Sequence, residues 1–309
     1  MKAGDKTFYD GYWKGQVALS CDEKCRLRFI VSEVDTVARR EARAAVDLGA
    51  RLGVAGRKPR LRIADVGCGR GWLTEVLSHF GEAVGFDQST VEAARRYPRL
   101  TFIERDVLDL EQAPAPRAHD AHSKRDRLES AGRERPGPHE QDVPGDFDVA
   151  VCSEVVEHIR REDQPKLAES ISSILRQEGT LILTTPNRPV VARVVEKLGL
   201  QNELQPVEDW LDAEALSRLL NPRFEVLKLT TLMFFPAWMR RIGPTSRAYR
   251  TFYETWGGHR AVDPVLGPTL RGLYLGAVAR KRATSPSPAA GASDGEATAG
   301  GRAPTNGAR

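Results

Sequence analysis

Strand-length apolar runs alternate with helical patterns along most of this chain. Runs that are apolar throughout are typical of parallel strands with helices packed on both faces, whereas half-exposed strands alternate apolar and polar residues. The pattern therefore predicts an α/β fold built on a parallel sheet. The predicted strands cover residues 63–65, 83–87, 101–107, 147–152, 179–186, 223–230 and 272–280.

Helices are predicted where apolar residues recur at intervals of three and four. The longest covers residues 22–53, where Phe29 and Ile30 belong to the apolar face. Two shorter helices are predicted near residues 188–198 and 212–220. Because these helices fall between or beside the predicted strands, they are placed to cover the faces of the sheet.

Two segments contain too few apolar residues to form a core. Residues 111–145 hold five prolines and no aromatic residue, and residues 283–309 hold no Val, Leu, Ile, Met or aromatic residue. Segments of this composition are expected to be disordered. We therefore expect an N-terminal aromatic turn and helix (1–55), one α/β domain (56–282) with a disordered insertion at 111–145, and a disordered tail at 283–309.

The first predicted strand leads into the most informative motif of the chain, residues 63–73, which read IADVGCGRGWL. The alternate glycines Gly67, Gly69 and Gly71 allow a sharp turn and leave no Cβ between the loop and a ligand. The helix that follows points its unpaired N–H groups at the same place. A dinucleotide motif has its third glycine three residues after the second, not two, and Asp65 favours a cationic amino acid moiety over a pyrophosphate. The loop therefore favours S-adenosylmethionine over a dinucleotide.

A second carboxylate ends the second predicted strand. Asp87 follows Gly67 by twenty residues, a spacing suited to a ribose contact. Its two acceptor oxygens can hold both ribose hydroxyls. The alternative is that Asp87 caps the helix that starts near Ser89.

These motifs resemble those of the class I S-adenosylmethionine-dependent methyltransferases, and the resemblance covers residues 60–280. It implies a Rossmann-like sheet of seven strands, mostly parallel with the last strand antiparallel. It also implies that Asp106 accepts from the adenine amino group, for which a surface turn is the alternative. The implied cofactor-binding residues are Asp65, Gly67, Cys68, Gly69, Gly71, Asp87, Gln88, Asp106, Val107, Ser153 and Glu154.

Candidate catalytic residues follow the fourth predicted strand, where Glu154, Glu157 and His158 form an E-x-x-E-H pattern. If residues 154–159 are helical, these three side chains lie on one face and suit a divalent metal such as Mg²⁺, Mn²⁺ or Zn²⁺. Without a metal, His158 or Glu157 can act as the base that removes a hydroxyl proton as the methyl group arrives. A helix start rich in acids is the structural alternative, and it does not account for the histidine.

The E-x-x-E-H pattern is similar to that of the ubiquinone-pathway O-methyltransferases and of small-RNA 2′-O-methyltransferases. In the RNA enzymes another histidine follows the fifth strand, and here none follows until His259. We therefore expect methyl transfer to a small molecule, on a phenol, catechol or sugar hydroxyl of a biosynthetic pathway. The alternatives are RNA 2′-O-methylation, N- or C-methylation of a small molecule, and a non-catalytic protein that binds the cofactor.

Aromatic residues gather in two parts of the chain. Those at 8–13 either pack on the core or shield the sulfonium of the cofactor. Residues 231–271 hold seven of the 21 aromatic residues, which predicts a cap or a substrate lid. Within this segment, residues 234–241 place apolar rings beside Arg240 and Arg241, a pattern that also suits peripheral contact with a membrane surface.

Composition bears on partners and compartment. The net charge is only +4 and no long basic run is interleaved with aromatic residues, so a nucleic-acid partner is not indicated. The four cysteines, Cys21, Cys25, Cys68 and Cys152, are too few and too scattered for a disulfide scaffold. No apolar run is long enough to span a membrane and the N-terminus has no apolar signal core, so we expect a cytoplasmic protein.

Overall fold

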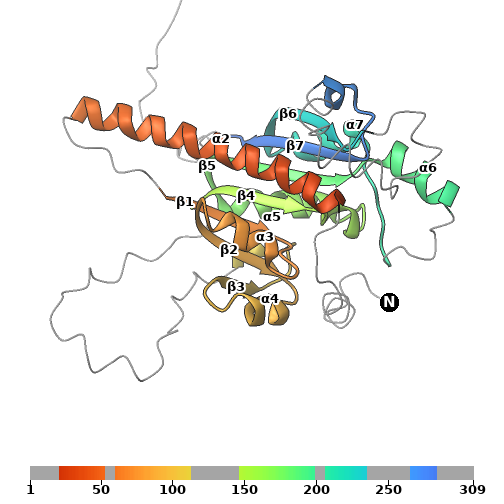
Figure 1. Ribbon diagram of the computed structural model, residues 1–309, viewed down its shortest axis with the longest axis horizontal. Coiled ribbons are helices and arrows are strands. Elements are labelled where there is room, and N and C mark those ends of the chain that lie inside the picture. Colours follow the sequence, from red (N-terminus) through yellow and green to blue (C-terminus); the bar gives the residue numbers. More distant parts are fainter. Residues whose placement is uncertain (1–20, 53–59, 113–145, 199–205, 235–264, 284–309) are drawn as a thin grey trace, which may run out of the picture.

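The fold is a seven-stranded sheet with helices on both faces (Figure 1). This computed structural model describes residues 21–52, 60–112, 146–198, 206–234 and 265–283. The strands are β1 (Leu61–Val66), β2 (Gly81–Asp87), β3 (Thr101–Glu104), β4 (Phe147–Ser153), β5 (Leu175–Pro186), β6 (Phe224–Leu232) and β7 (Tyr274–Lys281). The α-helices are α2 (Cys21–Leu52), α3 (Trp72–Leu77), α4 (Val91–Arg96), α5 (Gln164–Ile174), α6 (Arg188–Leu198) and α7 (Ala213–Leu220). Short 3₁₀ helices are η1 (Leu110–Gln112), η3 (Val156–His158) and η7 (Gly267–Thr269).

The strands lie in the order β3-β2-β1-β4-β5-β7-β6. Neighbouring strands from β3 to β5 pair in parallel, whereas β7 runs antiparallel to both β5 and β6. This order confirms the expected doubly wound, Rossmann-like sheet, mostly parallel with its last strand antiparallel. Ligands of such sheets bind beyond the carboxyl ends of the strands, where the strand order reverses. Here it reverses between β1 and β4, so the loops after these strands are the place to look for a site.

Apolar side chains form one buried cluster on each face of the sheet. On one face, Ile30 and Val34 of α2 and Leu77 of α3 pack against the strands. On the other face, Leu167 of α5 and Leu216 of α7 do the same. The central strands read as continuous apolar runs because both of their faces are covered.

The long amphipathic helix predicted at 22–53 is confirmed by α2, which ends at Leu52. Figure 1 shows α2 lying along the sheet, and its apolar face shares one core with the strands. The predicted helices near 188–198 and 212–220 are likewise confirmed by α6 and α7. The division of the chain at residues 55 and 56 stays a prediction.

Two strand boundaries differ from the predicted ones by more than two residues. β3 ends at Glu104, so Asp106 lies in the turn after the strand and not within it. β5 begins at Leu175 and not at residue 179. Polar residues at 176–178 hid this start, and Glu178 takes a left-handed φ of 59° at that point.

The two predicted insertions also begin later than expected. Leu110–Gln112 form the 3₁₀ helix η1, because Leu110 is fully buried and its N–H donates to Oγ of Ser170 at 2.8 Å. β6 continues to Leu232, and both Thr231 and Leu232 are buried. The aromatic segment therefore begins two residues later than predicted.

Several predictions concern residues outside the described ranges. These are the aromatic turn at 8–13, the insertion at 113–145, most of the aromatic segment, at 235–264, and the tail at 284–309. They stay predictions. In the part of the chain that the structure describes, no helix combines the length and the apolar composition needed to cross a membrane.

Candidate functional site

The loop between β1 and α3 carries three glycines in left-handed backbone conformations. Their φ angles are +77° at Gly67, +51° at Gly69 and +78° at Gly71, values that residues with a Cβ rarely adopt. At Gly67 packing also requires glycine, because a Cβ would lie 2.3 Å from Cγ2 of Val155, in the loop after β4. The glycines therefore bring the β1 and β4 loops into contact at the carboxyl edge of the sheet.

Asp87, the last residue of β2, links the glycine loop to the neighbouring strand. Its Oδ2 accepts from the backbone N–H of Gly69 at 2.9 Å, and its Oδ1 accepts from the backbone N–H of Ser89 at 3.0 Å. The next residue, Gln88, is half-buried. The carboxylate therefore lies against the loop as a ribose contact requires, while its bond to Ser89 is the one expected of a local cap.

Asp65 is almost fully buried at the end of β1. The hydroxyl of Thr74 donates to its Oδ2 at 2.6 Å. Burial, with a smaller contribution from the charge of Asp87, raises the pKa of Asp65 to about 7. A buried carboxyl group with a raised pKa is well matched to a cationic ligand, because the cation would favour the charged form.

Cys68 and Asp106 differ in how they face the site. Cys68 is buried with its Sγ next to β2, since a Cβ at Gly85 would lie 2.9 Å from that sulfur. Its side chain therefore packs in the interior, and only its main chain lines the loop. Asp106 is exposed, and its Oδ1 accepts from the backbone N–H of Leu108 at 2.9 Å, while Val107 is half-buried. The surface-turn interpretation of Asp106 thus has a hydrogen bond to support it.

The end of β4 carries Ser153 and Glu154. The Ser153 hydroxyl lies 2.9 Å from the hydroxyl of Thr184 on β5. Glu154 adopts a left-handed φ of 58°, an uncommon conformation for a residue with a side chain. Its Oε2 lies 3.6 Å from the guanidinium of Arg26, which also stacks over the Tyr274 ring at 4.6 Å. The start of α2 therefore reaches the carboxyl edge of β4.

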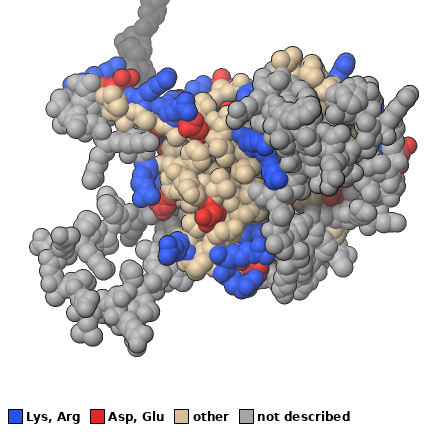
Figure 2. Space-filling model, in the orientation of Figure 1, with Lys and Arg blue, Asp and Glu red and all other residues tan. Residues whose placement is uncertain are grey.

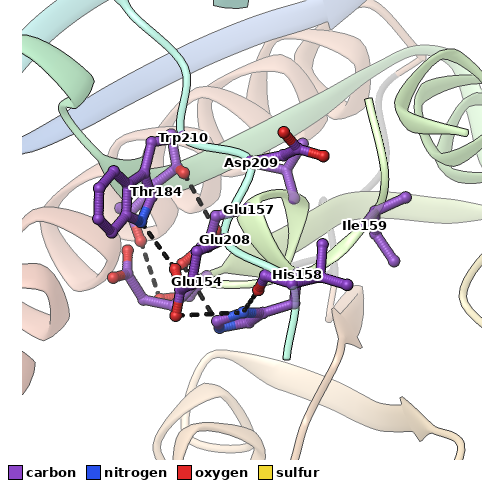
Figure 3. Close-up of polar contacts among 12 residues, drawn as sticks. Glu154, Glu157, His158, Ile159, Thr184, Glu208, Asp209 and Trp210 are labelled. Carbon is purple, nitrogen blue, oxygen red and sulfur yellow. Dashed lines mark hydrogen bonds and ion pairs between the residues drawn. The ribbon is translucent and has the colours of Figure 1, made fainter. Parts of the chain in front are cut away.

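Glu157 lies in η3, and Figure 3 shows it beside His158. The Thr185 hydroxyl donates to its Oε2 at 3.0 Å, and only 1% of the residue is exposed. Burial raises the pKa of Glu157 to about 8. At pH 7 its protonated form is therefore favoured, which makes it a poor base at that pH.

His158 is held by groups on both sides of its ring (Figure 3). Nδ1 lies 3.2 Å from the carbonyl oxygen of Val207 and 3.8 Å from Oε1 of Glu208. Nε2 lies 3.9 Å from Oε1 of Glu157. A carbonyl oxygen can only accept, so Nδ1 carries the hydrogen of the neutral ring and Nε2 carries the lone pair. This tautomer leaves Nε2 able to accept a proton.

The segment 207–211, which carries Glu208, is fixed against η3 by buried hydrogen bonds. The amide nitrogen of Gln164, a residue 2% exposed, donates to the carbonyl oxygens of Val156 at 3.2 Å and Asp209 at 3.1 Å. The backbone N–H of Asp209 donates to the carbonyl oxygen of Glu157 at 2.8 Å. The distance between Glu208 and His158 is therefore set by the folded main chain.

The sequence interpretation missed two charged residues of this region, Arg26 and Glu208. An arginine between the buried residues Cys25 and Phe29 of an amphipathic helix was the available signal for Arg26. Glu208 has no such signal, because nothing in its local pattern relates it to His158.

The predicted metal site does not match the structure. Residues 154–159 do not form one helix: Glu154 is in a left-handed conformation before η3, which covers only Val156–His158. Glu154 pairs with Arg26, while Glu157 is bound by Thr185. Among the described residues, no three His, Cys, Asp or Glu side chains are grouped so that they could hold a metal ion. The metal prediction for Glu154, Glu157 and His158 therefore has no structural support.

Comparisons with known proteins bear on this site. A family model described as a methyltransferase domain matches residues 37–242. A ubiquinone biosynthesis O-methyltransferase of Xanthomonas campestris is 24% identical over 201 residues, which cover 61% of this chain and 72% of that protein. The protein of the same name from Pseudomonas aeruginosa is 28% identical over 157 residues, which cover 50% of this chain and 55% of that protein.

Solved structures are similar at lower identity. The magnesium protoporphyrin IX methyltransferase of Synechocystis, solved with bound S-adenosylhomocysteine, is 17% identical. The match covers 91% of this chain and 95% of that one, with a TM-score of 0.43.

Proposed function

We propose that this chain, which belongs to the methyltransferase domain family and is a class I S-adenosylmethionine-dependent methyltransferase, methylates a hydroxyl oxygen of a small molecule. The acceptor is a phenol, a catechol or a sugar hydroxyl. The observation that carries the proposal is the His158 ring, whose Nδ1–H···O=C bond to Val207 leaves Nε2 as a proton acceptor. The curated relatives named above as O-methyltransferases support the same acceptor atom.

The described residues fit the cofactor. S-adenosylmethionine supplies an activated methyl carbon when it is bound. We assign the methionine portion to the left-handed glycine loop, the ribose to Asp87 beside that loop, and the ammonium group to the buried Asp65. We assign the adenine contacts to Asp106 and Val107. The remaining contacts around the loop are assigned to the main chain of Cys68 and to Gln88, Ser153 and Glu154.

His158 carries the acid–base step of the proposed reaction. The acceptor oxygen forms its bond to the methyl carbon as its proton passes to Nε2, and the electron pair of the carbon–sulfur bond stays on sulfur. His158 then releases the proton to water. Glu157 is the weaker candidate for this step, because burial keeps its carboxyl group largely protonated at pH 7.

The charge on the face shown in Figure 2 is consistent with a small-molecule acceptor. Uncharged residues form the middle of the face shown in Figure 2, and Lys and Arg lie around them in separate groups. A nucleic acid would be expected to contact a continuous basic stripe. We therefore keep the small molecule as the proposed acceptor.

The affinity for S-adenosylmethionine is expected to rise with pH between pH 5 and pH 7. The free protein holds Asp65 with a pKa of about 7, so it must lose a proton before the carboxylate can pair with the ligand ammonium. Because one proton is released on binding, the affinity should rise by up to roughly tenfold for each unit by which the pH is raised below that pKa. The amino group of the ligand stays charged over this pH range. Calorimetry in two buffers of different ionisation enthalpy measures the released proton. Asp65→Asn should bind weakly with no such slope, and a flat profile in the wild type would remove Asp65 from the ammonium contact.

A matched pair of acceptors tests the proposed reaction. The protein is incubated with methyl-labelled S-adenosylmethionine and either catechol or 1,2-diaminobenzene, which places amines where catechol has hydroxyls. We expect labelled methyl on the catechol oxygen and much less on the diamine. Transfer to the diamine alone would assign the enzyme to nitrogen, and transfer to neither, with phenol and a methyl glycoside also unmodified, would reject this acceptor class.

A further inference from the structure

We propose that Glu208 is a positioning residue for His158: its carboxylate holds the ring with Nδ1 towards Val207 and balances the charge that the ring gains during transfer. This inference rests on the proposed oxygen methylation. Glu208 comes from the segment before α7, about fifty positions after His158 in the chain, and it meets His158 only in the folded protein.

The geometry gives the Glu208 carboxylate two distinct partners. Oε2 accepts from the indole N–H of Trp210 at 2.7 Å, while Oε1 lies 3.8 Å from Nδ1 of His158. The side chains of Glu208 and His158 are each only 16% exposed, so water screens their interaction less than that of a surface pair. The indole N–H binds one carboxylate oxygen, while the other oxygen is the one near the ring (Figure 3).

The other groups around the ring leave this role to Glu208. Glu157 lies 3.9 Å from Nε2, on the side where the proton arrives, and burial favours its neutral form at pH 7. The Val207 carbonyl oxygen fixes the tautomer but carries no net charge. Among the cations described at this edge, Arg26 is directed to Glu154, and the guanidinium of Arg161 donates to the carbonyl oxygen of Trp210 at 3.0 Å. The carboxylate of Glu208 is thus the group that can oppose a positive charge formed on the ring.

Glu208→Gln is the central test, because glutamine keeps the size and the acceptor for Trp210 but removes the charge. We expect kcat for catechol methylation to fall by roughly 10-fold to 100-fold, which is part of the range that base catalysis supplies. KM for catechol and Kd for S-adenosylmethionine should stay within about twofold of the wild type, because the substitution does not change interactions that are equally strong in the ground state and the transition state. Glu208→Asp, which restores the charge on a shorter stem, should recover part of the lost kcat.

Trp210→Phe is the matched control. It removes the indole donor from Glu208 but keeps an aromatic ring and leaves the carboxylate near His158. If Glu208 acts by its charge, kcat should stay within about threefold of the wild type. If Glu208 merely anchors the segment through Trp210, Trp210→Phe should lose activity and melting temperature while Glu208→Gln, which keeps the acceptor, retains both, and the inference is wrong.

A double-mutant cycle with His158→Ala separates this inference from the proposed function. Once the ring is absent, Glu208→Gln should cause no further loss of kcat, because the two residues act as one unit. If His158→Ala alone leaves kcat unchanged, the proposed base is wrong and this inference falls with it. If His158→Ala lowers kcat but Glu208→Gln does not, or if their losses are additive, only the role of Glu208 is rejected.

Discussion

Replacing Gly69 with valine is expected to abolish cofactor binding while the domain stays folded. Gly69 has a φ of +51°, and its N–H is bound by Asp87, so its Cα position is fixed at the carboxyl edge of β1 and β2. A branched side chain there would overlap the proposed methionine portion of S-adenosylmethionine. Overpacking of this kind costs about 1–3 kcal/mol. Together with the distortion of the loop, this cost should weaken S-adenosylmethionine binding by roughly 100-fold or more. Isothermal titration calorimetry with S-adenosylmethionine measures the effect.

Glu178→Val controls for backbone strain in this experiment. Glu178 has nearly the same left-handed conformation, with a φ of 59°, but lies exposed near the start of β5, at the opposite edge of the sheet. Gly69→Val should lower the melting temperature modestly, since a left-handed residue with a Cβ costs roughly 1–2 kcal/mol. Glu178 already has a Cβ, so Glu178→Val adds only the strain of a branched Cβ in this conformation. Only Gly69→Val should lose the cofactor. A folded Gly69→Val protein with unchanged affinity would exclude the glycine loop from the binding site.

The sheet could be predicted from the sequence because its signals are local. Residues 63–65 and 147–152 are apolar apart from one aspartate each, which favours strands buried on both faces. Asp65 and Asp87 could be placed at one edge because parallel strands end together. Even the long helix α2 was visible as an apolar stripe around Phe29.

The edge that carries His158 was harder to predict because tertiary contacts determine it. The metal-site interpretation depended on one helix over 154–159, but Val155 packs against Gly67 and Glu154 is in a left-handed conformation before η3. That change moves Glu154 towards Arg26 and away from a shared face with His158. The pairing of Glu208 with His158 joins positions distant in the chain, and no periodic pattern encodes such a distance.

His158→Ala is expected to lower kcat for catechol methylation by roughly 10²–10⁴-fold while leaving cofactor affinity intact. The reason is that a hydroxyl oxygen attacks the methyl carbon only as its proton leaves, and Nε2 of His158 is the acceptor that the Val207 bond makes available. None of the proposed cofactor contacts passes through this ring. Steady-state kinetics with catechol, together with calorimetry for S-adenosylmethionine, measures the two quantities separately.

His79→Ala provides the matched control for the loss of an imidazole. His79 is exposed after α3, and its ring contacts only the carbonyl oxygens of Glu75 and Val76 among the described hydrogen bonds. Its loss should leave kcat within about twofold of the wild type, as for other surface substitutions. Equal kcat values for His158→Ala and His79→Ala would remove His158 from the chemistry. In that case the enzyme would act by alignment of the acceptor alone, which suits an already nucleophilic amine better than a hydroxyl.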